Sequence, residues 1–423
     1  MNQAQAITVL PGARRGEVTV PSSKSHVHRL LIAAALGEEP VQVRLRGLSD
    51  DILATAACLR AMGAEVDCAE DGISVLPIDR SRLLEEEAVL SCGESGSTLR
   101  FLLPVLGACG ICGCFRMEGR LPQRPMDAFE DELRRHGMII AREGSLLHAS
   151  GRLTAGEYRL PGNISSQYFS GLLFALPLLE GDSVLTAEGV LESGAYIRMT
   201  ETVLESAGIV FKKNGNSWRI PGGQRYALPR ELTAEGDWSG AAFFLCLGAL
   251  SCGETAARGL RADSVQGDRA VLDTLRDFGA EVSVCGETVT VKAGARRPFT
   301  LDAAGVPDLV PVLSVLACGA EGESEIRHAA RLRMKESDRL RSTAQMINDL
   351  GGEAVEKEDG LVIRGHGSLR GGKADSVHDH RIAMSAAVAA AICREAVEIS
   401  DPDCVEKSYP AFWQDFEALE TEG

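Results

Sequence analysis

A helix end of the form Leu-x-x-x-Gly, followed by a strand-like alternation of apolar and polar residues, recurs along the chain. The five copies are LRAMGAEVDC, LRRHGMIIA, LESAGIVFKK, LRDFGAEVSV and INDLGGEAVE, the last with Ile in place of Leu. Their glycines are Gly63, Gly137, Gly208, Gly279 and Gly351, at intervals of 74, 71, 71 and 72 residues. Glycine in this place supplies the left-handed C-cap that ends a helix before a strand. One further interval of 72 residues reaches Gly423, the last residue, so six units are predicted to fill the chain.

The two ends of the chain are predicted to share a unit. The last unit has no strand after its glycine, whereas the chain begins with a strand, ITVLPG. We expect this N-terminal strand to complete the C-terminal unit. A chain of 423 residues also exceeds what one hydrophobic core supports, so six units divide into two domains of three. We predict an α/β fold with one domain over residues 22–235 and the other over residues 1–21 and 236–423.

A second pattern has the same period: a polar loop opens a helix that is apolar nearly all round. The polar residues at the six openings are Ser25, Ser97, Ser166, Ser239, Asp308 and His380, at intervals of 72, 69, 73, 69 and 72 residues. Helices that are apolar all round are buried, so these six are expected at the centres of the domains. Their N-termini carry unpaired N–H groups and a positive dipole end, which suits anionic ligands. In the loop EGDWSG, Asp237 is expected to cap a helix.

Composition narrows the function further. The net charge is −16, which argues against a nucleic-acid or anionic-membrane partner but leaves small anionic substrates open. The longest uncharged apolar run, Phe101–Phe115, has 15 residues, whereas a membrane span needs roughly 20. Twelve cysteines without regular pairing indicate a reducing compartment, hence the cytoplasm. Cys109, Cys112 and Cys114 lack the second pair or nearby histidine that a metal site needs, so no metal is expected.

Specific residue combinations occupy the loops. Lys24, Ser25 and Arg29 form K-S-x-x-x-R at a helix start, and Arg124 lies in LPQRPM. A further helix opens on Ser165-Ser166-Gln167. The remaining motifs are RMKESDR with Lys335, Glu336, Asp338 and Arg339, DHR with Asp379, His380 and Arg381, and EKSYPAF with Lys407.

Together and in this order, these motifs closely resemble the EPSP synthase family, the 3-phosphoshikimate 1-carboxyvinyltransferases. The resemblance runs from Lys24 to Lys407 and so covers nearly the whole chain. It implies the family's inside-out α/β barrel, with three similar units in each of two domains. It also implies transfer of the carboxyvinyl group of phosphoenolpyruvate to shikimate 3-phosphate through a tetrahedral intermediate, without metal or organic cofactor. A monomer is the default expectation.

The resemblance also implies roles for individual residues. The residues that look like shikimate 3-phosphate contacts are Ser25, Arg29, Ser165, Ser166, Tyr196 and Lys335, with Gln167 between the substrates. Those that look like phosphoenolpyruvate contacts are Lys24, Arg124, Arg339, Arg381 and Lys407, with Gly96 close beside them; His380 of DHR joins the binding set. Asp308 resembles the residue that takes the proton from the 5-hydroxyl, and Glu336 the one that protonates the vinyl carbon. Lys24 and Lys407 complete the expected catalytic set.

The chemistry needs these residue types. The substrates bring two phosphates and two carboxylates, which Arg binds by paired planar hydrogen bonds. Addition across the enol double bond requires a base and an acid, and elimination of phosphate reverses their tasks. Which carboxylate moves which proton in each step stays open. The chain departs from the family pattern at Glu94, which we leave out of the binding set, and at Arg331, which faces either a phosphate or solvent.

Two alternatives remain at this point. The sister enzyme that transfers the same group to UDP-N-acetylglucosamine shares the fold and the donor, but its early Lys-x-x-Asn element is absent from SKSHVHR. A non-catalytic anion-binding relative would not need both Asp308 and Glu336.

Overall fold

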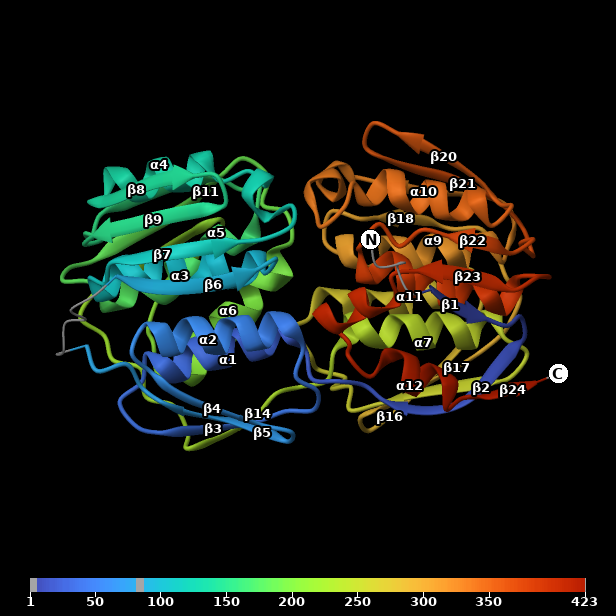
Figure 1. The fold of residues 1–423 in the computed structure, drawn as a ribbon, viewed down its shortest axis with the longest axis horizontal. Coiled ribbons are helices and arrows are strands. Elements are labelled where there is room, and N and C mark those ends of the chain that lie inside the picture. Colours follow the sequence, from blue (N-terminus) through green and yellow to red (C-terminus); the bar gives the residue numbers. More distant parts are fainter. Residues whose placement is uncertain (1–5, 81–86, 423) are drawn as a thin grey trace. The chain divides into compact units, whose positions relative to one another are not determined.

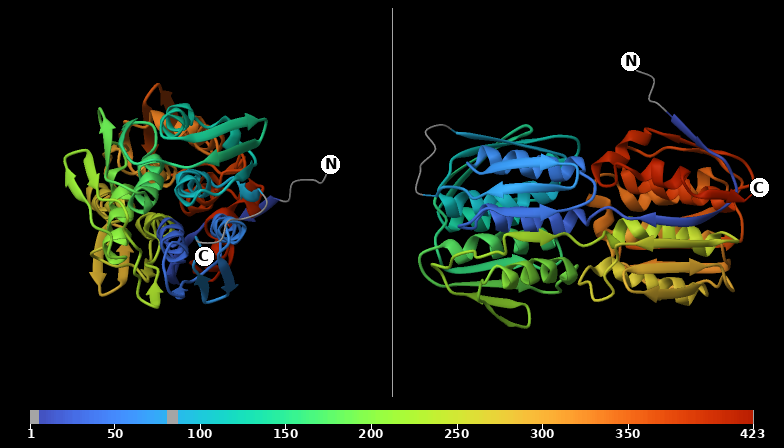
Figure 2. Two further views of the ribbon diagram at one scale, coloured as in Figure 1. Left: turned by 90° about the vertical axis from the view of Figure 1, so that its left-hand side faces the viewer. Right: turned by 90° about the horizontal axis from the view of Figure 1, so that it is seen from below.

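The computed structural model describes residues 6–80 and 87–422. The chain forms two compact units, Lys24–Ala234, here the middle unit, and Met1–Ser23 with Glu235–Gly423, here the terminal unit. Each unit has its own hydrophobic core, and the two cores share no residue. Sheets lie on the outside of each unit and helices on the inside (Figures 1 and 2).

Three four-stranded sheets surround the middle unit. In spatial order the first contains β14 (Glu231–Thr233), β3 (Val41–Arg44), β5 (Gly72–Leu76) and β4 (Glu65–Ala69). The second contains β6 (Ala88–Gly93), β7 (Gly113–Met117), β9 (Leu146–Gly151) and β8 (Met138–Glu143). The third contains β10 (Glu157–Pro161), β11 (Ser183–Glu188), β13 (Ser217–Ile220) and β12 (Lys212–Asn214). In each sheet the first two strands are parallel and the rest form an antiparallel hairpin.

The helices of the middle unit alternate between two kinds. The central helices are α1 (Lys24–Ala35), α3 (Gly96–Cys109) and α5 (Ser166–Ala175). Most of their residues are buried, as expected of helices that are apolar nearly all round. The other helices are α2 (Asp50–Ala61), α4 (Asp127–Arg135) and α6 (Gly194–Ser206), and two 3-10 turns are η1 (Leu121–Gln123) and η2 (Leu176–Leu178).

The terminal unit repeats this plan. Its first sheet contains β16 (Glu281–Cys285), β17 (Thr288–Lys292), β15 (Glu254–Arg258), β2 (Ala13–Thr19) and β24 (Glu420–Glu422). Its second contains β18 (Thr300–Asp302), β19 (Glu321–Arg327), β21 (Gly360–His366) and β20 (Glu353–Lys357). Its third contains β1 (Ala6–Val9), β23 (Val397–Ser400) and β22 (Gly372–Ala374). In this last sheet the N-terminal strand β1 pairs antiparallel with β23.

Central helices again fill the interior of the terminal unit. They are α7 (Trp238–Leu250), α9 (Val310–Cys318) and α11 (His380–Ala389). All thirteen residues of α7 are buried. The other helices are α8 (Val271–Phe278), α10 (Arg339–Asp349) and α12 (Phe412–Glu417). The 3-10 turns are η3 (Gly267–Ala270), η4 (Pro307–Leu309), η5 (Ala330–Met334), η6 (Ala390–Ile392) and η7 (Pro402–Lys407).

The five repeat glycines have the backbone that the pattern predicts. The φ angles of Gly63, Gly137, Gly208, Gly279 and Gly351 are 99°, 97°, 75°, 97° and 83°, so all five lie where side chains are disfavoured. Each follows a helix and precedes a strand, which confirms the helix-to-strand turns. The sixth predicted helix end, LETEG, is wrong over its described residues, because Glu420–Glu422 form the strand β24. Gly423 lies outside the described residues, and α12 ends at Glu417 before β24, whose pairing with β2 satisfies edge groups of that strand.

None of the helices within residues 6–80 and 87–422 combines the length and apolar character that crossing a bilayer requires.

Candidate active site

The six polar residues of the second repeat all lie where a helix begins. Ser25, Ser97 and Ser239 are second residues of α1, α3 and α7, and Ser166 and His380 are first residues of α5 and α11. Asp308 is the second residue of η4, which leads directly into α9. The predicted helix openings are therefore confirmed.

Four of these helices are capped by the side chain that precedes them. Ser95, Ser165, Asp237 and Asp379 each accept a hydrogen bond from a backbone N–H in the first turn, at 3.3, 3.3, 3.2 and 3.0 Å. The capping role predicted for Asp237 is confirmed. Such caps satisfy one of the first N–H groups and leave others available to a ligand.

In the middle unit, Lys24 and Arg29 of α1 have different surroundings. Lys24 Nζ donates to Asp51 Oδ2 at 2.7 Å. Arg29 is buried and donates to the Ser25 carbonyl at 2.6 Å, to Thr200 Oγ1 at 2.8 Å and to the Tyr196 carbonyl at 2.8 Å. Burial lowers the pKa of Arg29 to about 9, against a raising effect of Tyr196. A guanidinium held at this depth, beside the start of α1, is suited to a phosphate.

The starts of α3 and α5 are joined through Gln167. Its Nε2 donates to Ser97 Oγ at 2.9 Å, and its Oε1 accepts from Arg100 Nη1 at 2.9 Å. Gly96 lies against two guanidinium groups, since an added Cβ would stand 2.6 Å from Arg100 Nη1 and 2.8 Å from Arg124 Nη1. The structure thus brings Gly96, Arg124 and Gln167 into one neighbourhood and adds Arg100 to them.

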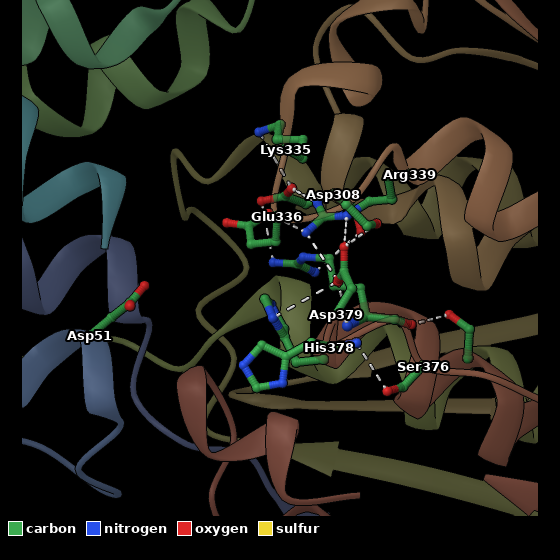
Figure 3. A network of polar contacts seen from close by, with 12 residues as sticks. Asp51, Asp308, Lys335, Glu336, Arg339, Ser376, His378 and Asp379 are labelled. Atoms are coloured by element: carbon green, nitrogen blue, oxygen red, sulfur yellow. Dashed lines mark hydrogen bonds and ion pairs between the residues drawn. The ribbon is translucent and has the colours of Figure 1, made fainter. Parts of the chain in front are cut away.

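In the terminal unit, Arg339 is the centre of a cluster of charged groups (Figure 3). It donates from Nε to Asp379 Oδ2 at 2.9 Å and from Nη2 to Asp379 Oδ1 at 3.2 Å. It also donates from Nη1 to Asp308 Oδ1 at 2.9 Å and from Nη2 to Glu336 Oε2 at 2.6 Å. Burial opposes the charge of Arg339, but the three carboxylates outweigh it and raise its pKa above the ordinary value.

Asp308 is surrounded by cations. Arg381 Nη2 donates to Oδ2 at 3.2 Å, and Lys335 Nζ lies 3.7 Å from Oδ1. Burial alone would raise the pKa of Asp308, yet Arg381, Lys335 and Arg339 together hold it well below its usual range. For Lys335, burial outweighs the attraction of Asp308 and lowers the pKa to about 8.

A further buried carboxylate, Asp268 of η3, belongs to this neighbourhood. Burial and the nearby charge of Asp308 raise its pKa to about 7, against the lowering influence of Arg381 and of the Ser239 hydroxyl. Asp268 could not be predicted from the sequence, because a single Asp in QGDRA carries no local pattern. The same holds for Asp51 and Arg100, whose partners come from other helices.

The last two expected residues of the terminal unit are buried. His380 Nδ1 lies 4.0 Å from Asp379 Oδ1, and its side chain is 2% exposed. Lys407 is the final residue of η7, which packs against α11, the helix that carries His380 and Arg381.

Glu94 and Arg331, where the sequence departs from the family pattern, each lie against identifiable neighbours. The carboxylate of Glu94 lies over Gly119, because an added Cβ on that glycine would overlap Glu94 Oε1. Arg331 lies in η5, close enough to Lys335 to lower its pKa. Arg331 therefore adds positive charge to the Lys335 side of the cluster.

Comparison with known proteins agrees with this arrangement. A sequence model described as EPSP synthase (3-phosphoshikimate 1-carboxyvinyltransferase) matches residues 10–416. The chain belongs to the EPSP synthase family. It is 41% identical to the 3-phosphoshikimate 1-carboxyvinyltransferase of Clostridium acetobutylicum and 39% identical to that of Clostridium kluyveri. Each alignment covers 98% of this chain and 97% of the relative.

The fold matches members of the same family. EPSP synthase from Acinetobacter baumannii superposes with a TM-score of 0.81 at 26% identity, covering 99% of this chain and 100% of that one. This likeness confirms the predicted α/β architecture of two domains with three similar units each. As a member of the EPSP synthase family, the chain is an enzyme of the transferase class.

Proposed function

We propose that this chain transfers the carboxyvinyl group of phosphoenolpyruvate to the 5-hydroxyl of shikimate 3-phosphate and releases phosphate, a step of the shikimate pathway to aromatic amino acids. The observation that carries the proposal is the match to the EPSP synthase family over residues 10–416. That span includes every residue with an expected catalytic role, from Lys24 to Lys407.

We assign the binding of shikimate 3-phosphate mainly to the middle unit. Ser25, Ser165 and Ser166 lie at helix starts, where hydroxyl and backbone N–H groups suit phosphate oxygens. Arg29 and Tyr196 are held together by the hydrogen bond from Arg29 Nη2 to the Tyr196 carbonyl. Lys335 of the terminal unit supplies a further positive charge in this assignment.

Phosphoenolpyruvate contacts are assigned within each unit. In the middle unit they are Lys24, Arg124 and the backbone of Gly96, with Gln167 between the substrates. In the terminal unit they are Arg339, Arg381, His380 and Lys407. Arg339 already uses four of its five N–H groups on carboxylates, so it has one left for a substrate oxygen. Its larger task is to hold the three carboxylates in place.

Asp308 is assigned as the base toward the 5-hydroxyl. With its pKa held well below the usual range, Asp308 is ionised but weakly basic in the free protein. Substrate phosphates and carboxylates that bind Lys335, Arg339 or Arg381 offset the charge of these cations. The pKa of Asp308 then rises, so the base becomes stronger once the substrates are bound.

Glu336 is assigned as the acid that protonates the methylene carbon. It receives a hydrogen bond from Arg339 Nη2, the same guanidinium that holds Asp308. One side chain therefore fixes both proton-transfer groups, which is what addition followed by elimination requires. Lys24 and Lys407 are assigned to stabilise the charge that develops on the phosphoenolpyruvate group.

Phosphate release from phosphoenolpyruvate tests the reaction. Turnover is expected with shikimate 3-phosphate as acceptor and not with UDP-N-acetylglucosamine. Turnover with the UDP-sugar alone would replace the proposal by the sister reaction. Folded protein that is silent with both acceptors would replace it by a binding function without catalysis.

The proton roles need a separate test. In deuterated water, reversible addition exchanges the methylene hydrogens of phosphoenolpyruvate with solvent. Glu336→Gln is expected to abolish this exchange, because the variant cannot deliver a proton to carbon. Pre-formed tetrahedral intermediate should lose phosphate slowly with both Glu336→Gln and Asp308→Asn, because elimination needs a base that takes a proton from the methyl carbon and an acid that protonates the leaving phosphate. Exchange that is abolished in Asp308→Asn but retained in Glu336→Gln would exchange the assignments.

We further propose that the enzyme acts as a cytoplasmic monomer. All twelve cysteines are free thiols, which supports a reducing compartment. Light scattering on the eluting protein is expected to give one chain mass, 45.0 kDa. A mass of twice that value would contradict the monomer.

A further inference from the structure

Four buried polar side chains form a continuous hydrogen-bonded series through the middle unit. His28 Nδ1 lies 2.7 Å from Thr55 Oγ1, and Thr55 Oγ1 lies 2.7 Å from Thr98 Oγ1. Thr98 Oγ1 donates to Ser95 Oγ at 2.7 Å. The series, here the His28–Ser95 chain, joins α1, α2 and α3 and ends at the N-cap of α3. All four residues are buried.

The direction of each hydrogen bond in the chain follows from counting hydrogens. A hydroxyl has one hydrogen, and that of Thr98 goes to Ser95. Thr98 therefore accepts from Thr55, whose own hydrogen is then used. Thr55 must in turn accept from His28, so the hydrogen of the imidazole is on Nδ1. The other ring nitrogen, Nε2, is buried and has no hydrogen-bond partner among residues 6–80 and 87–422, which costs less for a bare lone pair than for an N–H group.

The protonation of His28 agrees with this direction. Burial lowers its pKa to about 3, and Lys24 and Arg29 add to that lowering while Asp51 opposes it. The ring is therefore neutral near pH 7 and has one N–H to donate. Of the two neutral tautomers, only the one with the hydrogen on Nδ1 completes the His28–Ser95 chain.

The two ends of the His28–Ser95 chain of hydrogen bonds lie beside two parts of the proposed phosphoenolpyruvate site. His28 is one turn after Lys24 on α1, and residues four apart share a helix face. Ser95 directly precedes Gly96, where α3 begins against Arg100 and Arg124. The His28–Ser95 chain thus links the start of α1 to the start of α3 through buried groups.

We propose that His28, as the Nδ1–H tautomer, is a positioning residue that fixes the first turn of α3 against α1 through Thr55 and Thr98. The expected consequence for phosphoenolpyruvate rests on the function proposed above. The shikimate 3-phosphate side has its own fixing bonds, from Arg29 Nε to Thr200 Oγ1 at 2.8 Å and from Thr200 Oγ1 to Ser170 Oγ at 2.8 Å. The two sets of bonds share no atom.

A pair of matched variants tests the positioning role. Thr98→Val and Thr200→Val each remove one buried hydroxyl at nearly constant volume. Thr98→Val is expected to raise the KM for phosphoenolpyruvate about tenfold, the worth of one hydrogen bond, with little change in the KM for shikimate 3-phosphate. Thr200→Val is expected to do the reverse. If each variant raised the KM for phosphoenolpyruvate and the KM for shikimate 3-phosphate equally, the substitutions would be destabilising the middle unit as a whole, and the proposal would be overturned.

The tautomer is tested without any turnover. Long-range 15N–1H spectra of the whole protein labelled on histidine nitrogen are expected to show His28 with its hydrogen on Nδ1 and a bare Nε2. His28→Asn, which keeps a donor near the Nδ1 position, should retain a low KM for phosphoenolpyruvate, whereas His28→Leu should resemble Thr98→Val. An Nε2–H signal would overturn the proposed direction of the hydrogen bonds in the His28–Ser95 chain. An inactive wild-type enzyme with the Nδ1–H signal would instead refute the proposed function and leave the chain intact.

Discussion

Arg339 donates two hydrogen bonds to Asp379, from Nε to Oδ2 at 2.9 Å and from Nη2 to Oδ1 at 3.2 Å. Arg339 is the first residue of α10, and Asp379 is the N-cap of α11. Ser337 Oγ adds a third hydrogen bond to Asp379 at 2.9 Å. The start of α10 is thereby bound to the start of α11 in the interior of the terminal unit, and the same guanidinium then reaches Asp308 and Glu336.

The first prediction concerns this guanidinium. Arg339→Lys keeps the charge but cannot form the planar paired contact, and it leaves buried carboxylates short of donors. We expect a loss of about 3 kcal/mol in the free energy of unfolding, which is typical when a buried ion pair loses one partner. Urea denaturation measures it. Arg341→Lys, on the exposed side of the same helix, is the control and should change little. Equal small effects would contradict the central role of Arg339.

The second prediction concerns pH. The pKa of Lys335 is about 8, lowered from 10.5, so in the free enzyme this amine loses its charge as the pH rises through 8. We expect kcat/KM for shikimate 3-phosphate to fall about tenfold per pH unit above that value, since this ratio reports groups of the free enzyme.

Lys335→Arg is expected to lose the alkaline fall, because guanidinium stays protonated throughout the range. Lys292→Arg, at an exposed lysine on β17, serves as control and should keep it. An unchanged alkaline fall in Lys335→Arg would assign it to another group.

The third prediction concerns space beside Gly96. The Cβ of Gly96→Ala would stand 2.6 Å from Arg100 Nη1 and 2.8 Å from Arg124 Nη1, so both flexible side chains must move. Because Arg124 is assigned to phosphoenolpyruvate, the KM for that substrate should rise about tenfold or more, while the fold stays intact. Steady-state kinetics measures it. Gly194→Ala, where an added Cβ meets no atom of the described residues within 4 Å, should leave both KM values unchanged.

The fourth prediction concerns Asp268. Its pKa is raised to about 7 in the folded state, whereas an unfolded Asp titrates near 3.8. The unfolded chain therefore releases this proton first as the pH rises, so the group costs stability between those two values. The free energy of unfolding of Asp268→Asn, relative to wild type, should therefore rise by up to about 1.4 kcal/mol per pH unit across that window. Above the window this difference should stay constant.

The control for this experiment is Asp277→Asn, at an exposed position of α8. Thermal or urea unfolding at pH 5, 6, 7 and 8 gives the difference at each point. If the difference in the free energy of unfolding between Asp268→Asn and wild type did not change with pH, the pKa of Asp268 in the folded protein would lie near its ordinary value.

The sequence by itself determined the repeat and the helix starts. Glycine at Gly63 or Gly279 has a local cause, because a helix that turns directly into a strand needs a residue with positive φ. Polar residues such as Ser166 and Asp237 cap helices through bonds to N–H groups a few residues away, which spacing reveals. The family motifs then named most residues of the site. The helix end predicted at LETEG failed because the pattern could not show that Glu420–Glu422 pair with β2 as an edge strand.

Only the tertiary structure decided which partners each charged or polar group has. Arg339 meets Asp379 from 40 residues away, and Thr55 meets Thr98 from 43 residues away. No periodicity relates such pairs, because they depend on how α2 packs against α3 and α10 against α11, and on the rotamers that this packing leaves. The pKa values follow the same rule. Asp268 and Asp308 are chemically identical side chains, yet their pKa values move in opposite directions. Burial raises that of Asp268, whereas Arg381, Lys335 and Arg339 outweigh burial and lower that of Asp308.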